Sequence, residues 1–173
     1  MAKVEIKIKG REALQKRLKE KRNRLISYLN DRLAQLAEEA VTYSKDNKGY
    51  KDRTGNLKNS ISFALYFNGK LITQGIGDGY NATYKDENNV VHNNPYTKGE
   101  VMQFRETALS EYAQKEGVVA PQGYSLVIVA GMRYGKYVEE NHGYNVLQLT
   151  KHYLREEMKG IFEEVINTIN SDG

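Results

Sequence analysis

The sequence predicts one α+β domain over residues 1–173, in which a small antiparallel or mixed sheet is packed by a long N-terminal helix and a C-terminal helix. Two apolar stripes at helical spacing predict the helices, one over residues 14–40 and one over residues 147–169. Alternating apolar residues next to an asparagine–glycine pair predict strands between them. A length of 173 residues is typical of one domain, and segregated strands and helices are typical of α+β folds.

The N-terminal part is expected to hold a short edge strand and one long helix. Val4, Ile6 and Ile8 alternate with charged residues, and Gly10 ends that pattern. The leucines that follow predict a helix over residues 12–44, which at 1.5 Å per residue is roughly 50 Å long. A globular domain of this chain length is roughly 40 Å across. The first half of the helix is therefore expected to project from the domain or to lie against another subunit.

A capped helical turn and a hairpin are expected next. The Thr54 hydroxyl is placed to accept from the first free amides of the turn, and Gly55 permits a tight backbone. Residues 60–67 then alternate, so that one face of the strand carries Ile61, Phe63, Leu65 and Phe67. Asn68 and Gly69 are the preferred pair for a type I′ turn, so a return strand should follow.

The rest of the chain is expected to combine an insertion with a buried strand and two helices. Residues 75–123 are polar and glycine-rich, which predicts an inserted, partly irregular surface excursion with weak helical spacing over residues 100–116. Residues 125–130 are continuously apolar, which predicts a central strand buried on both faces. Residues 134–140 predict a short helix, and the last helix is expected to start near Thr150. The apolar side of the short helix carries Tyr134, Tyr137 and Val138.

Composition excludes several classes of protein. Cysteine is absent, which excludes disulfides, thiolate nucleophiles and cysteine-ligated metal centres. No apolar run approaches the length of about 18 residues that a membrane span needs, and the N-terminus lacks the apolar core of a signal peptide. We therefore expect neither a membrane span nor secretion by that route.

No group of residues predicts catalysis or a cofactor. His92 lies among asparagines, and His152 and Glu156 have the i, i+4 spacing typical of a surface pair. Residues 139–142 offer carboxylates and a histidine, but no second cluster has matching metal-ligand spacing. The glycine-rich residues 75–79 lack the lysine and the hydroxyl residue of a phosphate loop. We expect no enzymatic activity, no metal or cofactor, and no small-molecule substrate.

Positive charge is concentrated near the N-terminus. Residues 1–50 hold 13 Lys and Arg against 7 Asp and Glu, whereas residues 51–173 hold 13 against 15. The densest run consists of Arg11, Lys16, Arg17, Lys19, Lys21, Arg22 and Arg24. A solvated helix face would account for this run, since Glu12 and Glu20 are interspersed, and so would a surface that meets phosphates or an acidic protein.

Two motifs, in this order, resemble a known family. The first is residues 52–61 (DRTGNLKNSI), and the second is residues 131–139 (GMRYGKYVE), which follow an apolar strand. Together they resemble the tail-component family of long-tailed bacteriophages and prophages, the tail-completion or neck proteins similar to the product of lambda gene Z. That family pairs a TGxLxxSI segment after a long N-terminal helix with a YAxYVExG segment before a terminal helix. The residues on the motif positions are Thr54, Gly55, Asn56, Leu57, Ser60, Ile61, Tyr134, Tyr137, Val138 and Glu139.

Three features depart from the family pattern. Gly135 stands where the family has alanine, and Gly143 is the nearest substitute for the glycine expected two residues after Glu139. The segment 75–123 is far longer than the family's connection. This length leaves the identity of the partners open.

The resemblance implies a non-enzymatic structural protein of the head–tail junction or tail top that acts as a ring-forming subunit. Its partners would be other neck and tail proteins. It would be made in the cytoplasm of a bacterial host and incorporated into the virion. The alternative is a basic nucleic-acid-binding module that uses the N-terminal helix, although the basic residues are not interleaved with aromatic ones. DNA binding is expected to be nonspecific at most.

A subunit interface is expected where the long helix leaves the domain. Leu14 and Leu18 would be exposed there, flanked by basic residues that include Arg17 and Arg22. The complementary patch would supply the carboxylates of Glu139 and Glu140. Glu139 is the candidate for a specific contact with an arginine or a backbone cap, either within the chain or across a subunit boundary. Contact between two different patches of the same chain is head-to-tail, the geometry that closes a ring.

Overall fold

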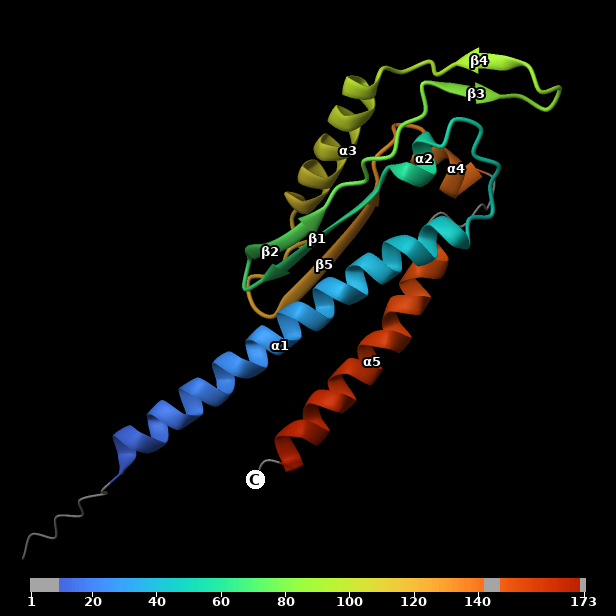
Figure 1. The fold of residues 1–173 in the computed structure, drawn as a ribbon. Helices are drawn as coiled ribbons and strands as arrows, with labels where there is room; N and C mark the ends of the chain where they lie inside the picture. Colours follow the sequence, from blue (N-terminus) through green and yellow to red (C-terminus); the bar gives the residue numbers. More distant parts are fainter. Residues whose placement is uncertain (1–9, 142–146, 172–173) are drawn as a thin grey trace, which may run out of the picture.

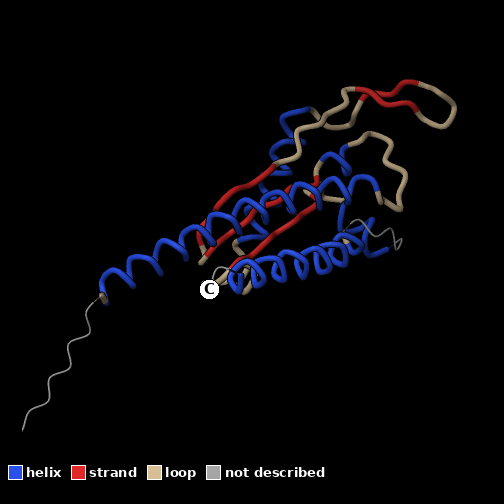
Figure 2. Tube along the Cα trace, turned by 60° about the horizontal axis from the view of Figure 1, so that its bottom comes forward, coloured by secondary structure: helices blue, strands red, loops and turns tan. Residues whose placement is uncertain are grey.

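The computed structural model describes residues 10–141 and 147–171 and confirms the α+β class, with a long N-terminal helix and an antiparallel sheet. The strand expected over residues 4–8 lies outside the described residues. The elements in chain order are α1 (Arg11–Asp46), α2 (Asn56–Asn59), β1 (Ile61–Phe67), β2 (Lys70–Gly75), β3 (Thr83–Lys85), β4 (Val91–Asn93), α3 (Lys98–Ala113), β5 (Tyr124–Ala130), α4 (Gly135–Asn141) and α5 (Gln148–Ser171). Helices cover both faces of the main sheet, with α1 and α5 on one side and α3 on the other (Figures 1 and 2).

Helix α1 is 36 residues long because no glycine or proline lies within it. Its apolar stripe has two environments. Leu33 and Leu36 are 2% and 1% exposed and pack with the sheet and α5, whereas Leu14 and Leu18 are 59% and 58% exposed. The first turns of α1 project beyond the sheet, as the predicted length required (Figure 1).

The main sheet has the strand order β2-β1-β5, and both pairings are antiparallel. The turn between β1 and β2 is the expected one, because Asn68 and Gly69 have φ angles of 51° and 75°, the positive values of a type I′ turn. Side chains of β1 alternate between two cores, with Leu65 facing α1 and α5, and Ala64 facing α3. Both faces of β1 are covered, so its first five residues are all buried.

The expectation that residues 125–130 form the central strand was wrong. Strand β1 takes the central position, and β5 lies at the edge of the sheet. Val127 and Val129 of β5 pack with α3, whereas Leu126 packs in the core with α1 and α5. A continuous apolar run indicates that helices cover both faces of a strand, and this can happen at an edge as well as at the centre.

The segment 75–123 contains a core helix, where its polar composition predicted a partly irregular surface excursion. Helix α3 begins with a capping box, in which the Thr97 hydroxyl accepts from the Glu100 amide and the Glu100 carboxylate accepts from the Thr97 amide. Val101 and Leu109 of α3 are 0% and 3% exposed. Within this segment, the β3–β4 hairpin projects away from the main sheet (Figure 1).

Helix α5 begins at Gln148, close to the expected start, and continues through Gly160. Its first turn is joined to the end of α1, since the hydroxyls of Ser44 and Thr150 lie 2.6 Å apart and both residues are buried. The two helices run side by side from this point toward their free ends (Figures 1 and 2). Within residues 10–141 and 147–171, no helix combines the length and the apolar composition that a membrane span requires.

Candidate functional site

The two motif segments, residues 52–61 and 131–139, meet in the structure because β1 and β5 pair along their whole lengths. The Gly131 amide donates to the Ser60 carbonyl at 3.1 Å. Ser60 is 0% exposed, and its hydroxyl donates to the Leu57 carbonyl at 2.8 Å. The sheet therefore joins two segments that are far apart in the sequence.

Side chains of both segments share one apolar cluster. Leu57 is buried with Met132, and Tyr134 and Val138 pack against them. A Cβ atom built on Gly135 would lie 3.2 Å from Leu57 Cδ1, which is a tight contact. The slot therefore suits glycine, and alanine would fit only if Leu57 moved by a few tenths of an ångström.

Asp52 is the principal cap of the helical turn, a role that was expected of Thr54. One Asp52 carboxylate oxygen accepts from the Gly55 amide at 2.9 Å and the other accepts from the Lys58 amide at 2.7 Å. The Thr54 hydroxyl accepts from the Asn56 amide at 3.2 Å, a longer bond. A charged acceptor makes the stronger hydrogen bonds, so Asp52 dominates. Gly55 has a φ of 77°, which confirms its role as the permissive residue of the turn.

A cavity of about 460 Å³ opens where the two motif segments meet. Its apolar lining includes Tyr50, Leu57, Tyr96, Tyr134 and Val138. Burial raises the pKa of Tyr134 to about 12, and burial also raises the pKa of Tyr50 above its usual range. Both phenols therefore remain protonated at neutral pH, which makes them hydrogen-bond donors and unsuitable as general bases.

A buried arginine, which no pattern in the sequence predicted, attaches residues 76–80 to the core. Arg105 of α3 is 0% exposed, and its guanidinium donates to the carbonyl oxygens of Gly77 and Gly79. Burial lowers the pKa of Arg105, and the nearby carboxylate of Asp78 acts in the opposite direction. An arginine normally remains charged in proteins, so a buried cation here is stabilised mainly by backbone carbonyl dipoles.

A pair of asparagines makes a second connection between the motif and the long segment. Asn56 is 1% exposed, and its side-chain amide donates to Asn94 Oδ1 at 2.9 Å. The Asn94 amide donates in return to Asn56 Oδ1 at 3.0 Å and to the Asn81 carbonyl at 2.8 Å. The motif asparagine is therefore a structural residue that positions the base of the β3–β4 hairpin.

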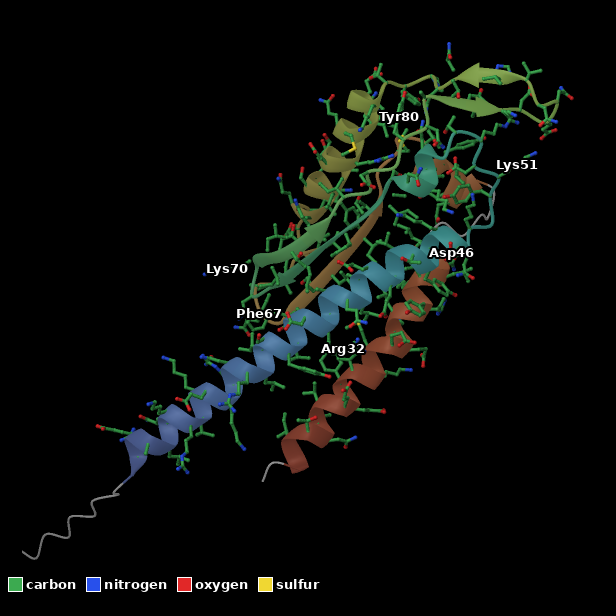
Figure 3. The ribbon with its side chains drawn as sticks, viewed as in Figure 1. Arg32, Asp46, Lys51, Phe67, Lys70 and Tyr80 are labelled. Atoms are coloured by element: carbon green, nitrogen blue, oxygen red, sulfur yellow. The ribbon has the colours of Figure 1, made fainter. Side chains whose placement is uncertain are left out.

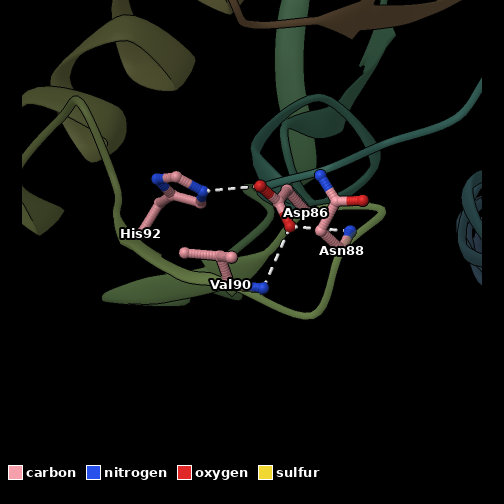
Figure 4. Close-up of polar contacts among 4 residues, drawn as sticks. All are labelled: Asp86, Asn88, Val90 and His92. Carbon is pink, nitrogen blue, oxygen red and sulfur yellow. Dashed lines mark hydrogen bonds and ion pairs between the residues drawn. The ribbon is translucent and has the colours of Figure 1, made fainter.

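The tip of the β3–β4 hairpin is organised around one carboxylate (Figure 4). Asp86 accepts from the amides of Asn88 and Val90 at 2.8 and 2.9 Å, and its other oxygen lies 2.9 Å from His92 Nε2. The hydrogen bond with His92, followed by the one from Val90, lowers the pKa of Asp86. His92, which is exposed, therefore helps to close the turn.

The expected position of Tyr137 needs correction, and Glu139 makes one of the contacts that were expected of it. Tyr137 was expected on the packed side of its helix, but it is 57% exposed, whereas Tyr134 and Val138 pack against the core. Glu139 accepts from the Leu147 amide at 3.1 Å, so at least part of its hydrogen-bonding capacity is used within the chain. Glu140 is exposed, and its Oε1 atom lies 3.8 Å from Lys136 Nζ.

The candidate interface residues lie at opposite ends of the molecule. Leu14, Leu18, Arg17 and Arg22 are all exposed at the start of α1, whereas Glu139 and Glu140 are on α4 beside the far end of α1 (Figure 1). One copy therefore cannot join these two patches to each other. The separation is compatible with a head-to-tail contact between copies.

The free ends of α1 and α5 enclose an apolar groove of about 520 Å³. Helix α1 contacts the sheet as far as Ile26, since the Tyr124 hydroxyl of β5 lies 3.3 Å from the Ile26 carbonyl oxygen and 2.8 Å from Asn30 Oδ1. The turns of α1 before Ile26 extend past the sheet (Figure 3). The groove is lined by Leu18, Lys21, Arg24, Leu25, Tyr28, Glu164, Val165, Thr168 and Ile169. The hydrogen bond with Glu164 is the main cause that raises the pKa of Tyr28, which places these two residues across the groove from each other.

The comparisons with known proteins assign no family to this arrangement: no protein-family model, curated protein or solved structure matches the chain. Among the residues that the structure describes, no three histidine, aspartate or glutamate side chains gather as a metal site would require.

Proposed function

We propose that this chain is a non-enzymatic structural subunit of the head–tail junction or tail top of a long-tailed phage or prophage. The observation that carries the proposal is that the two motifs resembling the tail-component family pack into one unit. The Gly131 amide bonds to the Ser60 carbonyl, and Gly135 fits against Leu57. Segments that pack against each other depend on each other's side chains. Their contact therefore supports treating the two motifs as one feature that the chain shares with the tail-component family.

The start of α1 supports an assembly role for this subunit. A monomeric protein rarely leaves large apolar side chains in a row at a helix surface unless they meet a partner. Leu14 and Leu18 are such a pair, and the basic side chains beside them can steer an acidic neighbour. In this proposal, copies of the chain form a homo-oligomeric ring, and other neck and tail proteins contact that ring. The chain is made in the host cytoplasm before it is incorporated.

The double substitution Leu14→Asp with Leu18→Asp is expected to leave the protein folded but absent from completed particles. Both side chains are more than half exposed, so the new charges cost little in the monomer and would oppose an apolar contact. Particles produced in the natural host are purified and probed for the subunit, and circular dichroism checks the fold of the purified variant.

The matched control is Asn23→Asp with Ser27→Asp, which adds the same charges at the same four-residue spacing. At roughly 100° per residue these positions lie on the opposite side of α1 from Leu14 and Leu18. Both are exposed, and this variant should enter particles normally. Absence of the unmodified protein from particles would contradict the proposed function, and normal incorporation of the leucine variant would contradict the role of α1.

A nucleic-acid-binding module is the second candidate, because the seven basic residues within residues 11–24 are all exposed. We expect the purified protein to bind DNA weakly and without sequence preference. If all seven met phosphates, affinity would fall by about 10³-fold or more between about 50 and 200 mM salt. Fluorescence anisotropy with two unrelated duplexes measures both properties. Nanomolar, sequence-selective binding at physiological salt would favour the nucleic-acid module over the structural role.

A further inference from the structure

We infer that the outer edge of β5 is a docking site for an extended segment from a second copy of this chain. The segment is residues 3–9 (KVEIKIK), which would join the main sheet as a further strand beside β5. The inference does not depend on the proposed function, because such strands would pair between purified copies whether or not the chain belongs to a phage particle.

The first step is that the outer edge of β5 offers unpaired backbone groups. Among the described residues, β1 is the only strand that pairs with β5. Asn68 and Gly123 continue the register of that pair, and the Asn68 amide donates to the Gly123 carbonyl at 2.8 Å. Every second residue of an antiparallel strand bonds to the same neighbour, counted here from Gly123. The amides and carbonyls of Leu126 and Ile128 therefore point away from β1.

The second step is a groove of about 840 Å³ that follows this edge. Leu126 packs in the core with α1 and α5, Val127 packs in the core with α3, and both line the groove. Neighbouring residues of a strand point to opposite faces, so a groove that touches both runs along the edge of β5. One wall of the groove belongs to α5 and includes Leu154 and Met158, and the other includes Tyr112 of α3.

The third step is that residues 3–9 have the pattern this groove requires. Three apolar residues alternate with four charged ones, so the extended segment has one apolar and one charged face. The apolar face suits Leu154 and Met158 on the α5 wall. The charged face then lies on the wall of Tyr112, which is 45% exposed, so its lysines reach water. This orientation also keeps those lysines away from Lys151 and Arg155, the basic residues of the α5 wall.

The other strand edges are poorer partners for this segment. Strand β2 is the second outer strand of the main sheet, but its register with β1 shifts between Leu65 and Tyr66, and such irregularities protect an edge from pairing. Strands β3 and β4 have three residues each, too few to pair with all of residues 3–9. Strand β5 is regular over seven largely apolar residues, the type of edge that pairs with another chain unless something covers it.

The fourth step is distance, which requires a second copy. The Tyr124 hydroxyl lies 3.3 Å from the Ile26 carbonyl oxygen, so β5 starts beside the middle of α1, and it runs away from the start of that helix (Figure 1). Gly10 precedes Ile26 by sixteen residues, which is roughly 24 Å along α1. Ile8 is two residues from Gly10 and can lie at most roughly 7 Å from it. The segment therefore cannot pair along β5 of its own copy while α1 is intact.

The absence of cysteine from the chain allows a direct test by crosslinking. Ile6→Cys is made in one copy and Tyr112→Cys in another that carries a size tag, and the mixed proteins are treated with a short bismaleimide. Because each copy has a single thiol, every crosslinked species is intermolecular. The tag separates mixed dimers from dimers of identical copies on a gel.

Ile6→Cys mixed with Leu71→Cys is the matched control, since Leu71 is 48% exposed on β2, the opposite edge of the sheet. We expect about tenfold more mixed dimer from the Tyr112 pair than from the Leu71 pair, because strand pairing raises the effective concentration of the two thiols. Equal yields, or no mixed dimer at high protein concentration, would overturn the inference. The same negative result is expected if a different protein supplies the strand.

Proline substitutions in the Ile6→Cys copy test whether the contact is strand pairing. Val4→Pro with Lys7→Pro places prolines at one even and one odd position, so in either register at least one amide that bonds to β5 is removed. The yield of mixed dimer with Tyr112→Cys should fall to that of the Leu71 control, whereas Val4→Ala with Lys7→Ala should keep most of it. An undiminished yield from the proline variant, or an equal loss from both variants, would contradict strand pairing. Particle incorporation is measured separately, so the proposed function can fail while this contact stands, or the reverse.

Discussion

Replacement of Leu33 by alanine is expected to lower the free energy of unfolding by about 2–5 kcal/mol, as is typical of a leucine removed from a packed core. Leu33 is 2% exposed and packs between the sheet, through Leu65, and helix α5, through Ile161. The three elements meet at this point, so the cavity left by the substitution cannot collapse without moving one of them. Urea unfolding, followed by circular dichroism, measures the change.

Leu14→Ala is the control for this substitution, since it removes the same side chain from the same stripe of α1. Leu14 is 59% exposed, so its replacement should change stability by no more than about 0.5 kcal/mol. Leu29 is partly buried in the same cluster as Leu33, and its replacement should have an intermediate effect. Equal effects of Leu14→Ala and Leu33→Ala would contradict the packing of α1 described here.

Replacement of Arg105 by methionine is expected to destabilise the protein by about 2–4 kcal/mol, although methionine retains most of the buried volume. The guanidinium donates to the carbonyl oxygens of Gly77 and Gly79, and each partly buried acceptor that loses its donor costs about 1–3 kcal/mol. Arg105→Lys should recover little, because one ammonium group cannot reproduce the planar fork that reaches both carbonyls.

Local detachment of residues 76–80 would distinguish this mechanism from a general loss of packing. Amide hydrogen exchange in that segment should accelerate in Arg105→Met under native conditions, while β1 remains protected. Arg133→Ala is the control, because the Arg133 guanidinium is exposed and stacks 4.6 Å from the Phe104 ring centre. Its loss should cost about 1 kcal/mol or less. An unchanged rate of amide exchange at residues 76–80 in Arg105→Met would contradict the proposal that Arg105 holds this segment on the core.

Local chemistry accounts for the elements that could be predicted from the sequence. The leucine row without glycine or proline predicted α1 closely, because helix periodicity depends on residues within two turns of one another. Asn68 and Gly69 predicted the turn of the β1–β2 hairpin, because few residues adopt two successive positive φ angles. The exposure of Leu14 and Leu18 also followed from arithmetic, since the helix is longer than a domain of this size.

Tertiary structure alone determined which strand is central and which polar residues are buried. The apolar run of β5 indicated two covered faces, but only the pairing with β1 placed it at the edge of the sheet. Arg105 stands in a helix whose sequence is mostly polar, and its burial depends on the loop that returns over it from residues 76–80. Asn56 likewise became structural only through Asn94, a partner far along the chain.

The sequence by itself therefore determined the length of α1, the hairpin turn and the uncovered start of α1, because each depends on neighbours along the chain. The two motif segments were recognisable in the sequence, but their contact was not. It exists because β1 and β5 pair, which brings the Ser60 carbonyl to the Gly131 amide. The apolar groove between α1 and α5 arose in the same way, since the burial of a side chain depends on which distant segment packs against it.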